Sequence, residues 1–258
     1  MAPDTAARFV PDWPAPFGVR ALCTTRAGGV STAPFDSFNL GDHVRDEPAA
    51  VAANRERFAA LTAPARPVFL RQVHGTGVVT LNAETPDGTE ADAAVVHTPG
   101  VAATIMVADC LPVLFAHASG RAAVAAHAGW RGLHGGVLEA ALKSLRDVAG
   151  PGEVIAWLGP AIGPTAFEVG EEVWEAFVTA DRAAVAHFRP HATRGKWWAD
   201  LPALARQRLV ASGLRSVHGN DGSAAWCTFS DDSRFFSHRR DAARLGSTGR
   251  FAASVWLG

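Results

Sequence analysis

Cysteine, lysine and long apolar runs are all scarce in this chain, and each scarcity excludes a class of protein. The three cysteines, Cys23, Cys110 and Cys227, are too few and odd in number for a disulfide scaffold. No apolar run approaches the roughly 18 residues that a membrane-spanning helix requires. The N-terminal residues contain no apolar segment of the kind found in signal peptides. We therefore expect a cytoplasmic protein with reduced thiols and no membrane partner.

Positive charge comes almost entirely from arginine, since Lys143 and Lys196 are the only lysines. The net charge of −1 provides no electrostatic reason to expect nucleic acid binding. Arginine can instead bind a phosphate or carboxylate through two parallel hydrogen bonds. The 258 residues, 48% of them hydrophobic, can bury a substantial core. We expect one domain over residues 1–258, with an irregular, proline-rich segment at 1–17.

Several catalytic motifs are also missing. There is no G-x-G-x-x-G or Walker A loop, so dinucleotide and P-loop nucleotide binding are unsupported. The H-x-E and P-C-x-x-C motifs of zinc nucleoside deaminases are absent, as is the G-x-S-x-G elbow of α/β-hydrolases. None of the ten histidines forms an H-x-H pair, which argues against the multicopper cluster of a laccase.

The most informative stretch contains two apolar runs on either side of a tight turn. Their composition predicts a hairpin with strands at Val113–His117 and Arg121–Ala126. In such a hairpin His127 lies opposite Leu111 or Pro112, so His127 and Cys110 come close in space. The pattern leaves open whether these two side chains point to the same face.

The remaining elements follow from periodicity and turn residues. The predicted helices are Ala49–Leu61, Val137–Val148, Gly170–Ala180 and Leu201–Ser212. The other predicted strands are Gly18–Thr25, Val68–Val73, Gly77–Leu81, Ala93–Val96, Ala102–Val107, Val154–Leu158, Cys227–Ser230, Arg234–Ser237 and Ala252–Leu257. Residues 182–198 are expected to be irregular, and an arginine-rich turn is expected near the C-terminus. Helices and strands interleave irregularly, which indicates an α+β fold with mixed or antiparallel sheets.

His74, Cys110 and His127 each end or follow a predicted strand, where side chains can converge in one cleft. A catalytic zinc ion takes three such ligands and keeps a fourth position open. The simpler interpretation is that the cysteine is inert core and the histidines are ordinary surface or hydrogen-bonded residues. Glycines beside the histidines favour the metal site, because glycine lets a ligand approach closely. Asp109 is either a residue that orients a histidine or a plain turn residue.

Two groups of arginines could bind an anion. Arg131 lies just before the predicted helix at 137–148, whose N-terminal amides favour negative charge. Arg234, Arg239 and Arg240 cluster beside a histidine and could clamp a phosphate or carboxylate. The simpler interpretation, a solvated arginine turn paired with neighbouring aspartates, is favoured by residue type alone.

Short motifs along the chain resemble those of one known family. They are TTRAGGVS from Thr24, NLGDHV from Asn39, RQVHG from Arg71, ADCLP from Ala108, HAGWRGL from His127, GPAIGP from Gly159, FEVG from Phe167, FFSHRRD from Phe235 and the dipeptide Gly249-Arg250. In this order they resemble the YfiH-like laccase-domain family, long labelled multicopper polyphenol oxidase and now described as purine nucleoside phosphorylase. The resemblance implies a layered α/β/β/α sandwich and a zinc site at His74, Cys110 and His127.

The resemblance also implies a function. Family members phosphorolyse adenosine, inosine and methylthioadenosine and deaminate adenosine, and bacterial members are implicated in peptidoglycan editing. We therefore expect a nucleoside and inorganic phosphate as small-molecule partners, with zinc as cofactor and copper as an alternative metal. The residues expected to be catalytic are Cys110, Asp109 and Arg240. The residues expected to bind substrate are Asn39, His43, Gln72, Arg131 and Arg240, the two arginines by holding phosphate.

Two rival functions use the same residues. A metal-free cysteine amidase or hydrolase, with Cys110 as nucleophile and His127 as base, would suit removal of L-serine from a muramyl precursor. A non-enzymatic protein that binds a nucleotide-like metabolite would be stabilised by its ligand without turning it over. Zinc content, protection of the thiol and product analysis separate the three functions.

Overall fold

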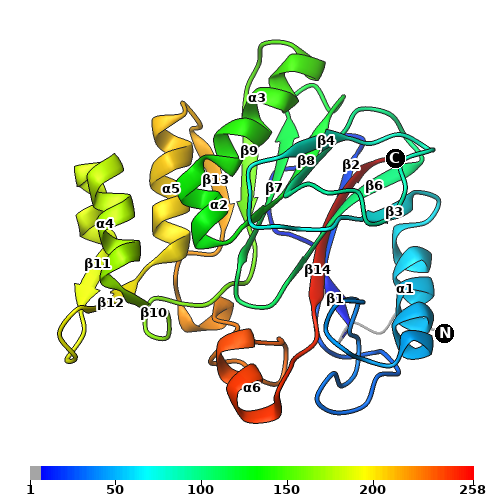
Figure 1. The fold of residues 1–258 in the computed structure, drawn as a ribbon. Helices are drawn as coiled ribbons and strands as arrows, with labels where there is room; N and C mark the ends of the chain where they lie inside the picture. The colour runs from blue at the N-terminus through cyan, green and yellow to red at the C-terminus, as the bar shows by residue number, and fades with distance from the viewer. Residues whose placement is uncertain (1–6) are drawn as a thin grey trace.

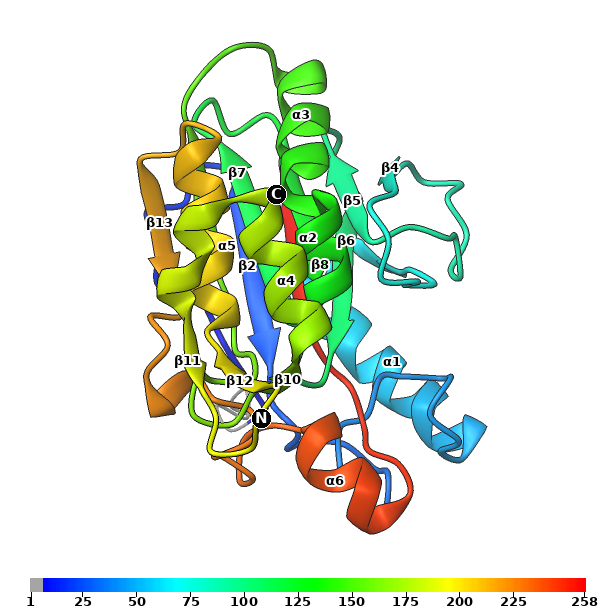
Figure 2. The ribbon, with the colours of Figure 1, turned by 60° about the vertical axis from the view of Figure 1, so that its left-hand side comes forward.

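Two β-sheets pack face to face, and helices cover the outer face of each sheet (Figure 1 and Figure 2). The structure is a computed structural model that describes residues 7–258, so the first residues of the predicted irregular segment lie outside the described residues. Three groups of buried hydrophobic side chains fill the spaces between the four layers. The layered α/β/β/α sandwich with mixed sheets is therefore confirmed.

The larger sheet has six strands in the order β13-β9-β7-β8-β5-β4. The strands are β4 (Val78–Thr80), β5 (Ala93–Val96), β7 (Leu111–His117), β8 (Ala123–Ala128), β9 (Val154–Leu158) and β13 (Ser216–Gly219). The two outer pairs are parallel and the inner pairs are antiparallel. Every residue of β7 and β8 is buried. Burial on both faces explains why these strands have nearly continuous apolar sequences rather than alternating ones.

The second sheet has five strands in the order β1-β2-β14-β6-β3. The strands are β1 (Arg8–Phe9), β2 (Val19–Thr24), β3 (Arg66–Phe69), β6 (Val101–Val107) and β14 (Phe251–Leu257). The strand β14, near the C-terminus, lies between β2 and β6, so distant parts of the chain meet here. The two-residue strand β1 falls within the segment predicted to be irregular.

Helices α2 to α5 cover the six-stranded sheet, and α1 covers the five-stranded sheet (Figure 1). Their bounds are α1 (Pro48–Thr62), α2 (Trp130–Gly135), α3 (Val137–Ala149), α4 (Glu171–Ala180) and α5 (Leu201–Ala211). Helix α3 buries Leu138, Ala141, Leu142 and Leu145, the spacing expected of a helix with one apolar face. In residues 7–258, no helix is sufficiently long and apolar to span a membrane.

The prediction of an irregular segment at residues 182–198 was wrong. This segment contains the 3₁₀ helix η1 (Arg182–His187) and the strands β11 (Phe188–Pro190) and β12 (Lys196–Ala199). With β10 (Glu168–Gly170) these strands form a small antiparallel sheet in the order β10-β12-β11. Strands of three or four residues are too short to show a periodic pattern, so periodicity could not reveal them.

Three further predictions were also wrong. The predicted pair Val68–Val73 and Gly77–Leu81 does not exist as a unit, because β3 and β4 belong to different sheets. Residues 227–230 and 234–237 form no named strand; the 3₁₀ helix η2 (Ala224–Trp226) lies just before them. The arginine-rich turn is instead the helix α6 (His238–Leu245), whose first turn is capped by the Ser237 side chain. This helix is mostly polar and exposed, so it lacks the apolar stripe that predicts a helix.

Candidate metal centre

The predicted hairpin is present, and its register positions Cys110 and His127. Strands β7 and β8 pair antiparallel with Pro112 opposite His127, as predicted. Leu114 and Ala125 belong to the core between the two sheets. Because side chains alternate along a strand, Cys110 and His127 point to the same side as these two core residues, at the end of the hairpin. The side chains of Cys110 and His127 therefore lie on the same face of the hairpin, the face that packs against the five-stranded sheet.

His74 completes a cluster of three side chains from the loop that follows β3. One ligand atom from each of His74, Cys110 and His127 lies within 4.8 Å of the others. Cys110 Sγ is 3.8 Å from His74 Nε2, and the rings of His74 and His127 meet edge to face. Within the described part of the chain, this is the one group of three His, Cys, Asp or Glu side chains positioned to share an ion. His74 is exposed and His127 is buried, so the cluster is open on one side, as a catalytic metal site requires.

Asp92 contacts two members of this cluster, and no motif or spacing in the sequence predicts its role. Its buried carboxylate accepts a hydrogen bond from Nδ1 of His127 at 2.8 Å. It also accepts backbone N–H groups from His74 at 2.9 Å and Gly75 at 2.7 Å. An acceptor on Nδ1 leaves Nε2 of His127 available as a ligand, which is the usual arrangement at metal-binding histidines. The available signal was an aspartate directly before the buried strand Ala93–Val96.

The backbone around the cluster has little freedom. His74 and Asp109 have positive φ angles of 61° and 90°, which are uncommon for residues other than glycine. Gly129 leaves space beside the ligands: a Cβ there would lie 2.9 Å from Cδ2 of His74 and 3.0 Å from Sγ of Cys110. Any larger residue at this position would push the ligands apart. Gly129, the first glycine of the HAGWRG motif, is therefore explained by the close approach of His74 and Cys110.

Attraction between Cys110 and His127 outweighs the cost of burying their charges. Burial alone would raise the pKa of the Cys110 thiol, but the charge of His127 and hydrogen bonds with both histidines lower it to about 6. Burial alone would lower the pKa of His127, but the charge of Cys110 and the hydrogen bond to Asp92 raise it to about 9. The thiolate is the form that binds metals and acts as a nucleophile. Two imidazoles and one thiolate suit zinc, and they also accept copper.

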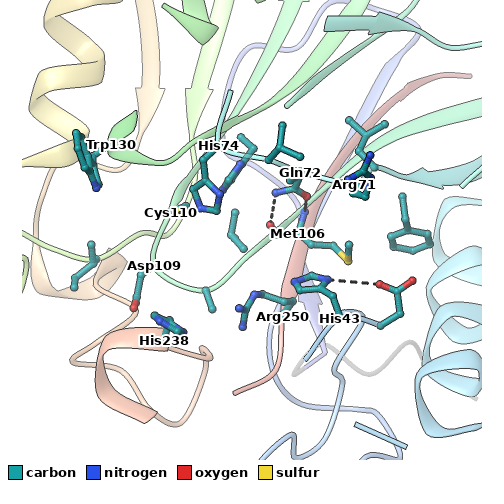
Figure 3. A pocket seen from close by; sticks show the side chains of 18 of the residues that line it. His43, Arg71, Gln72, His74, Met106, Asp109, Cys110, Trp130, His238 and Arg250 are labelled. Atoms are coloured by element: carbon teal, nitrogen blue, oxygen red, sulfur yellow. Dashed lines mark hydrogen bonds and ion pairs between the residues drawn. The ribbon is translucent and has the colours of Figure 1, made fainter. Parts of the chain in front are cut away.

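The cluster lies in the wall of a cavity of about 660 Å³ (Figure 3). Its apolar lining includes Phe69, Met106, Trp130, Ile162 and Phe167. Its polar lining includes His43, Gln72, Asp109, His238, Arg239 and Arg250. A cavity of this size, with apolar walls and a few polar groups, is typical of a site for a small molecule.

Two of the predicted substrate-binding residues, His43 and Gln72, line this cavity. The amide of Gln72 is already paired, donating to the carbonyl of Met106 at 2.8 Å and accepting its N–H at 2.9 Å (Figure 3). Asn39 does not line the cavity, and its fully buried side chain accepts the backbone N–H groups of Gly41 and Arg250. Asn39 and Gln72 thus support the walls, whereas His43 faces the space.

Arg131 and Arg240, predicted to hold phosphate, do not line the cavity. The Arg131 guanidinium lies 4.4 Å from the ring centroid of Trp130. Arg240 donates to three backbone carbonyls within residues 228–235 and pairs with both oxygens of Asp241 at 2.8 Å. Arg240 therefore stabilises the segment before α6. Because these bonds use most of the N–H groups of Arg240, few remain for a ligand.

Asp109, predicted to be catalytic, lines the cavity but has partners for both carboxylate oxygens. One accepts the hydroxyl of Thr228 and the other accepts the backbone N–H of Arg239, each at 2.6 Å. These bonds tie the start of β7 to the first turn of α6. Asp92 rather than Asp109 orients His127.

The arginines that do line the cavity are Arg55, Arg71, Arg239 and Arg250, and His238 lines it as well. Arg250 is partly buried, and its Nη1 donates to the carbonyls of Thr248 and Gly249, both at 3.0 Å. The sequence signal for Arg250 is its place in the Gly249-Arg250 motif. Nothing in the local sequence distinguishes it from Arg240, because only the packing of β14 against the 39–41 segment brings it to the cavity.

This chain is similar to known proteins over nearly its whole length. Residues 20–258 match the family described as "Multi-copper polyphenol oxidoreductase laccase". A Pseudomonas aeruginosa protein named purine nucleoside phosphorylase is 54% identical over 249 residues, which cover 96% of this chain and 98% of the relative. Escherichia coli purine nucleoside phosphorylase YfiH is 49% identical over 250 residues, with the same coverage of 96% and 98%.

Solved structures share this fold. A Neisseria meningitidis protein of the family DUF152 has a TM-score of 0.89 and 44% identity, covering 97% of this chain and 99% of its own. YlmD from Geobacillus stearothermophilus has a TM-score of 0.83 and 29% identity, covering 95% of this chain and 93% of its own. The arrangement of layers described above is therefore shared by bacterial relatives of different genera.

Proposed function

The chain belongs to the family described as multi-copper polyphenol oxidoreductase laccase, and on that premise we propose that it is a metal-dependent purine nucleoside phosphorylase. The observation that carries the proposal is the position of His74, Cys110 and His127 in the wall of a cavity suited to a small molecule. Relatives named purine nucleoside phosphorylase, at 54% and 49% identity, support the reaction type. The proposed substrates are adenosine, inosine and methylthioadenosine, each with inorganic phosphate.

His74, Cys110 and His127 would hold one zinc ion, with copper as the alternative occupant. Three observations support this assignment: the donor atoms of these side chains, the lowered pKa of Cys110, which favours the thiolate, and the space beside Gly129. A bound ion would supply a Lewis acid and, for the proposed deaminase side activity, a means of making water nucleophilic near neutral pH. Asp92 would keep His127 in the tautomer that presents Nε2 to the ion.

In phosphorolysis, a phosphate oxygen forms a bond to C1′ of the ribose as the bond from C1′ to the purine nitrogen breaks. The electron pair of the broken bond goes to the purine, which takes up a proton. The products are the free base and ribose 1-phosphate, or, from methylthioadenosine, the free base and the 1-phosphate of methylthioribose. The apolar lining, with Trp130, Phe167 and Met106, would hold the base and exclude water. His43 is the predicted polar residue that remains available to the substrate.

Product analysis tests the proposal directly. Zinc-loaded protein is incubated with inosine or adenosine and phosphate, and we expect ribose 1-phosphate together with the free base. Cys110→Ala is expected to lose both the zinc and the activity, whereas Cys227→Ala, which changes a buried cysteine outside the cluster, should keep both. Full zinc content and full phosphorolysis in Cys110→Ala would show that the metal assignment is wrong.

The second candidate is a cysteine amidase or hydrolase that acts on a muramyl precursor during peptidoglycan editing. The lowered pKa of Cys110 beside a positively charged His127 favours it, because this is how a nucleophilic cysteine is activated. Metal analysis of protein purified without added zinc, together with the rate of thiol alkylation, separates the two functions. Stoichiometric zinc and a protected thiol would exclude a metal-free amidase.

The third candidate is a non-enzymatic protein that binds a nucleotide-like metabolite in the same cavity. It predicts stabilisation by inosine without formation of any product.

A cytoplasmic location is part of the main proposal, since a thiol ligand must stay reduced and the substrates are intracellular metabolites.

A further inference from the structure

Arg250 is a cation in the cavity wall without an acidic partner. Among residues 7–258, no carboxylate lies within ion-pair distance of its guanidinium, although Arg55 and Arg71 in the same wall pair with Asp42 and Glu90. Arginine remains charged under all ordinary conditions. A partly buried charge without a counterion costs free energy, so the position favours an anion arriving from solution.

The protein holds Arg250 in one orientation before any ligand arrives. Its backbone N–H donates to Oδ1 of Asn39 at 2.8 Å, and its carbonyl accepts the N–H of Leu40 at 3.0 Å. Its side chain passes over Gly41, where a Cβ would lie 2.8 Å from Cγ of the arginine. Nη1 is fixed by the carbonyls of Thr248 and Gly249. A preorganised group binds its ligand without a further loss of conformational entropy.

One edge of this guanidinium remains available. Nε and Nη2 of Arg250 have no hydrogen-bond partner among the described residues, whereas Nη1 has two. The Nε–Nη2 edge is the side of an arginine that binds two oxygens of a phosphate or carboxylate at once. In Figure 3, Arg250 lies between His238 and His43, below Cys110. Arg239, which also lacks an acidic partner within the described chain, lines the same cavity, and its Nη1 donates to the carbonyl of Glu168 at 2.8 Å.

The surroundings select an anion rather than a neutral group. The two nearby aspartates are already engaged, Asp109 with Thr228 and the N–H of Arg239, and Asp42 with Arg55 and His43. Burial and the charge of Arg250 lower the pKa of both His43 and His238, so these imidazoles favour the neutral form that donates one hydrogen bond. Within the described chain, Arg250 and Arg239 are the arginines of this cavity that form no ion pair, whereas Arg55 and Arg71 form one each.

We propose that the free Nε–Nη2 edge of Arg250, beside His238 and in the same cavity as Arg239, binds the tetrahedral oxyanion that takes part in the reaction, namely inorganic phosphate. This inference rests on the proposed phosphorylase function and replaces Arg240 and Arg131 as the phosphate-binding cations. Phosphate held there lies along the same wall as Cys110, while the apolar lining remains free for the nucleoside.

The test compares three variants of the zinc-loaded protein. Arg250→Met removes the charge but keeps most of the side-chain volume, and Arg250→Lys keeps the charge but removes the two-oxygen fork. Arg208→Met is the control, because Arg208 is also partly buried but lies outside this cavity, where it pairs with Glu139. Steady-state phosphorolysis of inosine gives KM for phosphate and KM for inosine separately. Thermal unfolding with added phosphate, against chloride at equal ionic strength, measures binding without turnover.

We expect Arg250→Met to raise KM for phosphate about 10- to 100-fold, the loss typical of hydrogen bonds to a charged group, while KM for inosine changes less than about twofold. Arg250→Lys should show a smaller increase, and Arg208→Met should behave like the unmodified protein. Stabilisation by phosphate should disappear in Arg250→Met. If Arg250→Met does not fold, Arg250→Lys decides the question by the same measurements. An unchanged KM for phosphate, or equal increases for phosphate and inosine, would overturn the proposal.

The outcomes also distinguish this proposal from the proposed function. If the unmodified protein forms ribose 1-phosphate but the Arg250 variants keep their affinity for phosphate, the phosphorylase function stands and the Arg250 site is wrong. If phosphate stabilises the protein through Arg250 but no nucleoside is cleaved, the anion site stands and the phosphorylase function is wrong.

Discussion

At the scale of single residues, Asp92 connects the parts of the candidate metal centre that come from different segments. It contacts His127 on β8 and the backbone of the loop that carries His74. Its pKa is lowered: burial opposes the charge, but hydrogen bonds from His127 and from the N–H groups of Gly75 and His74 outweigh the burial. The carboxylate is thus charged at neutral pH and can hold His127 and the loop that carries His74 in place.

Replacing Asp92 should weaken metal binding without removing a ligand. We expect Asp92→Asn to lower the affinity for zinc about 10- to 100-fold, because His127 and the 73–75 loop lose a charged acceptor. Competition with a chromophoric chelator measures the affinity. Asp147→Asn, at an exposed carboxylate on α3, is the control and should bind zinc as tightly as the unmodified protein. Unaltered zinc affinity in Asp92→Asn would show that Asp92 has no role in orienting the ligands.

At the scale of elements, α6 owes its position to a pair of charged residues in adjacent positions. Asp241 is buried and accepts two hydrogen bonds from Arg240, one from Thr248 and one from the N–H of Ser237. Burial raises the pKa of Asp241, but the hydrogen bonds and charge of Arg240 lower it by more, so the pKa is below its usual value. The first turn of α6 carries His238 and Arg239 to the cavity.

This pair predicts how stability depends on pH. A carboxylate whose pKa is lower in the folded state stabilises the fold above the pKa of the unfolded chain, about 4, and this contribution is lost as pH falls through the folded-state pKa. Asp241→Asn should therefore be less stable than the unmodified protein at pH 7, and the difference should shrink below about pH 4. Urea unfolding at several pH values measures both proteins. A difference that is constant from pH 7 to pH 3 would contradict the linkage.

Helix α3 illustrates stability that comes from packing alone. Leu145 is completely buried against the six-stranded sheet. We expect Leu145→Ala to lower the free energy of unfolding by about 2–5 kcal/mol, because the mutation removes apolar contacts and leaves a cavity. Lys143→Ala, on the exposed face of the same helix, should change it by less than about 0.5 kcal/mol. Equal effects of the two mutations in urea unfolding would contradict the assigned face of α3.

At the scale of the whole molecule, the candidate metal centre joins segments that belong to different layers. His74 follows β3 of the five-stranded sheet, whereas Cys110 and His127 belong to the β7–β8 hairpin of the six-stranded sheet. An ion bound by all three would link the two sheets. Binding to the folded state alone would therefore raise the stability of the molecule as a whole.

Zinc should measurably stabilise the protein. At a zinc concentration of about 100 times Kd, a ligand that binds only the folded state adds about 2.7 kcal/mol. For a chain of this length that corresponds to an increase in Tm of roughly 5–10 °C. Calorimetry with and without zinc measures the shift, and a chelator should reverse it. Cys110→Ala should show little or no shift, and an equal shift in that variant would place the bound zinc elsewhere.

Much of the fold could be predicted because its signals are local. The stripe on α3, the turn between β7 and β8 and the opposition of Pro112 and His127 depend on residues close in sequence. The small sheet of β10, β11 and β12 and the polar helix α6 could not be predicted, because neither shows a periodic apolar pattern. The three clustered side chains were identified from strand ends and motifs, whereas Asp92 lacked a pattern of its own.

The sequence by itself determined the elements with strong periodicity, the hairpin that brings Cys110 near His127, and the family. Only the tertiary structure decided which side chains face the cavity. Arg240 and Arg250 are chemically identical, but Arg240 is engaged by Asp241 and backbone carbonyls, and Arg250 lines the cavity. The physical reason is that a side chain's partners come from segments distant in sequence, and their positions depend on how the layers pack rather than on any local pattern.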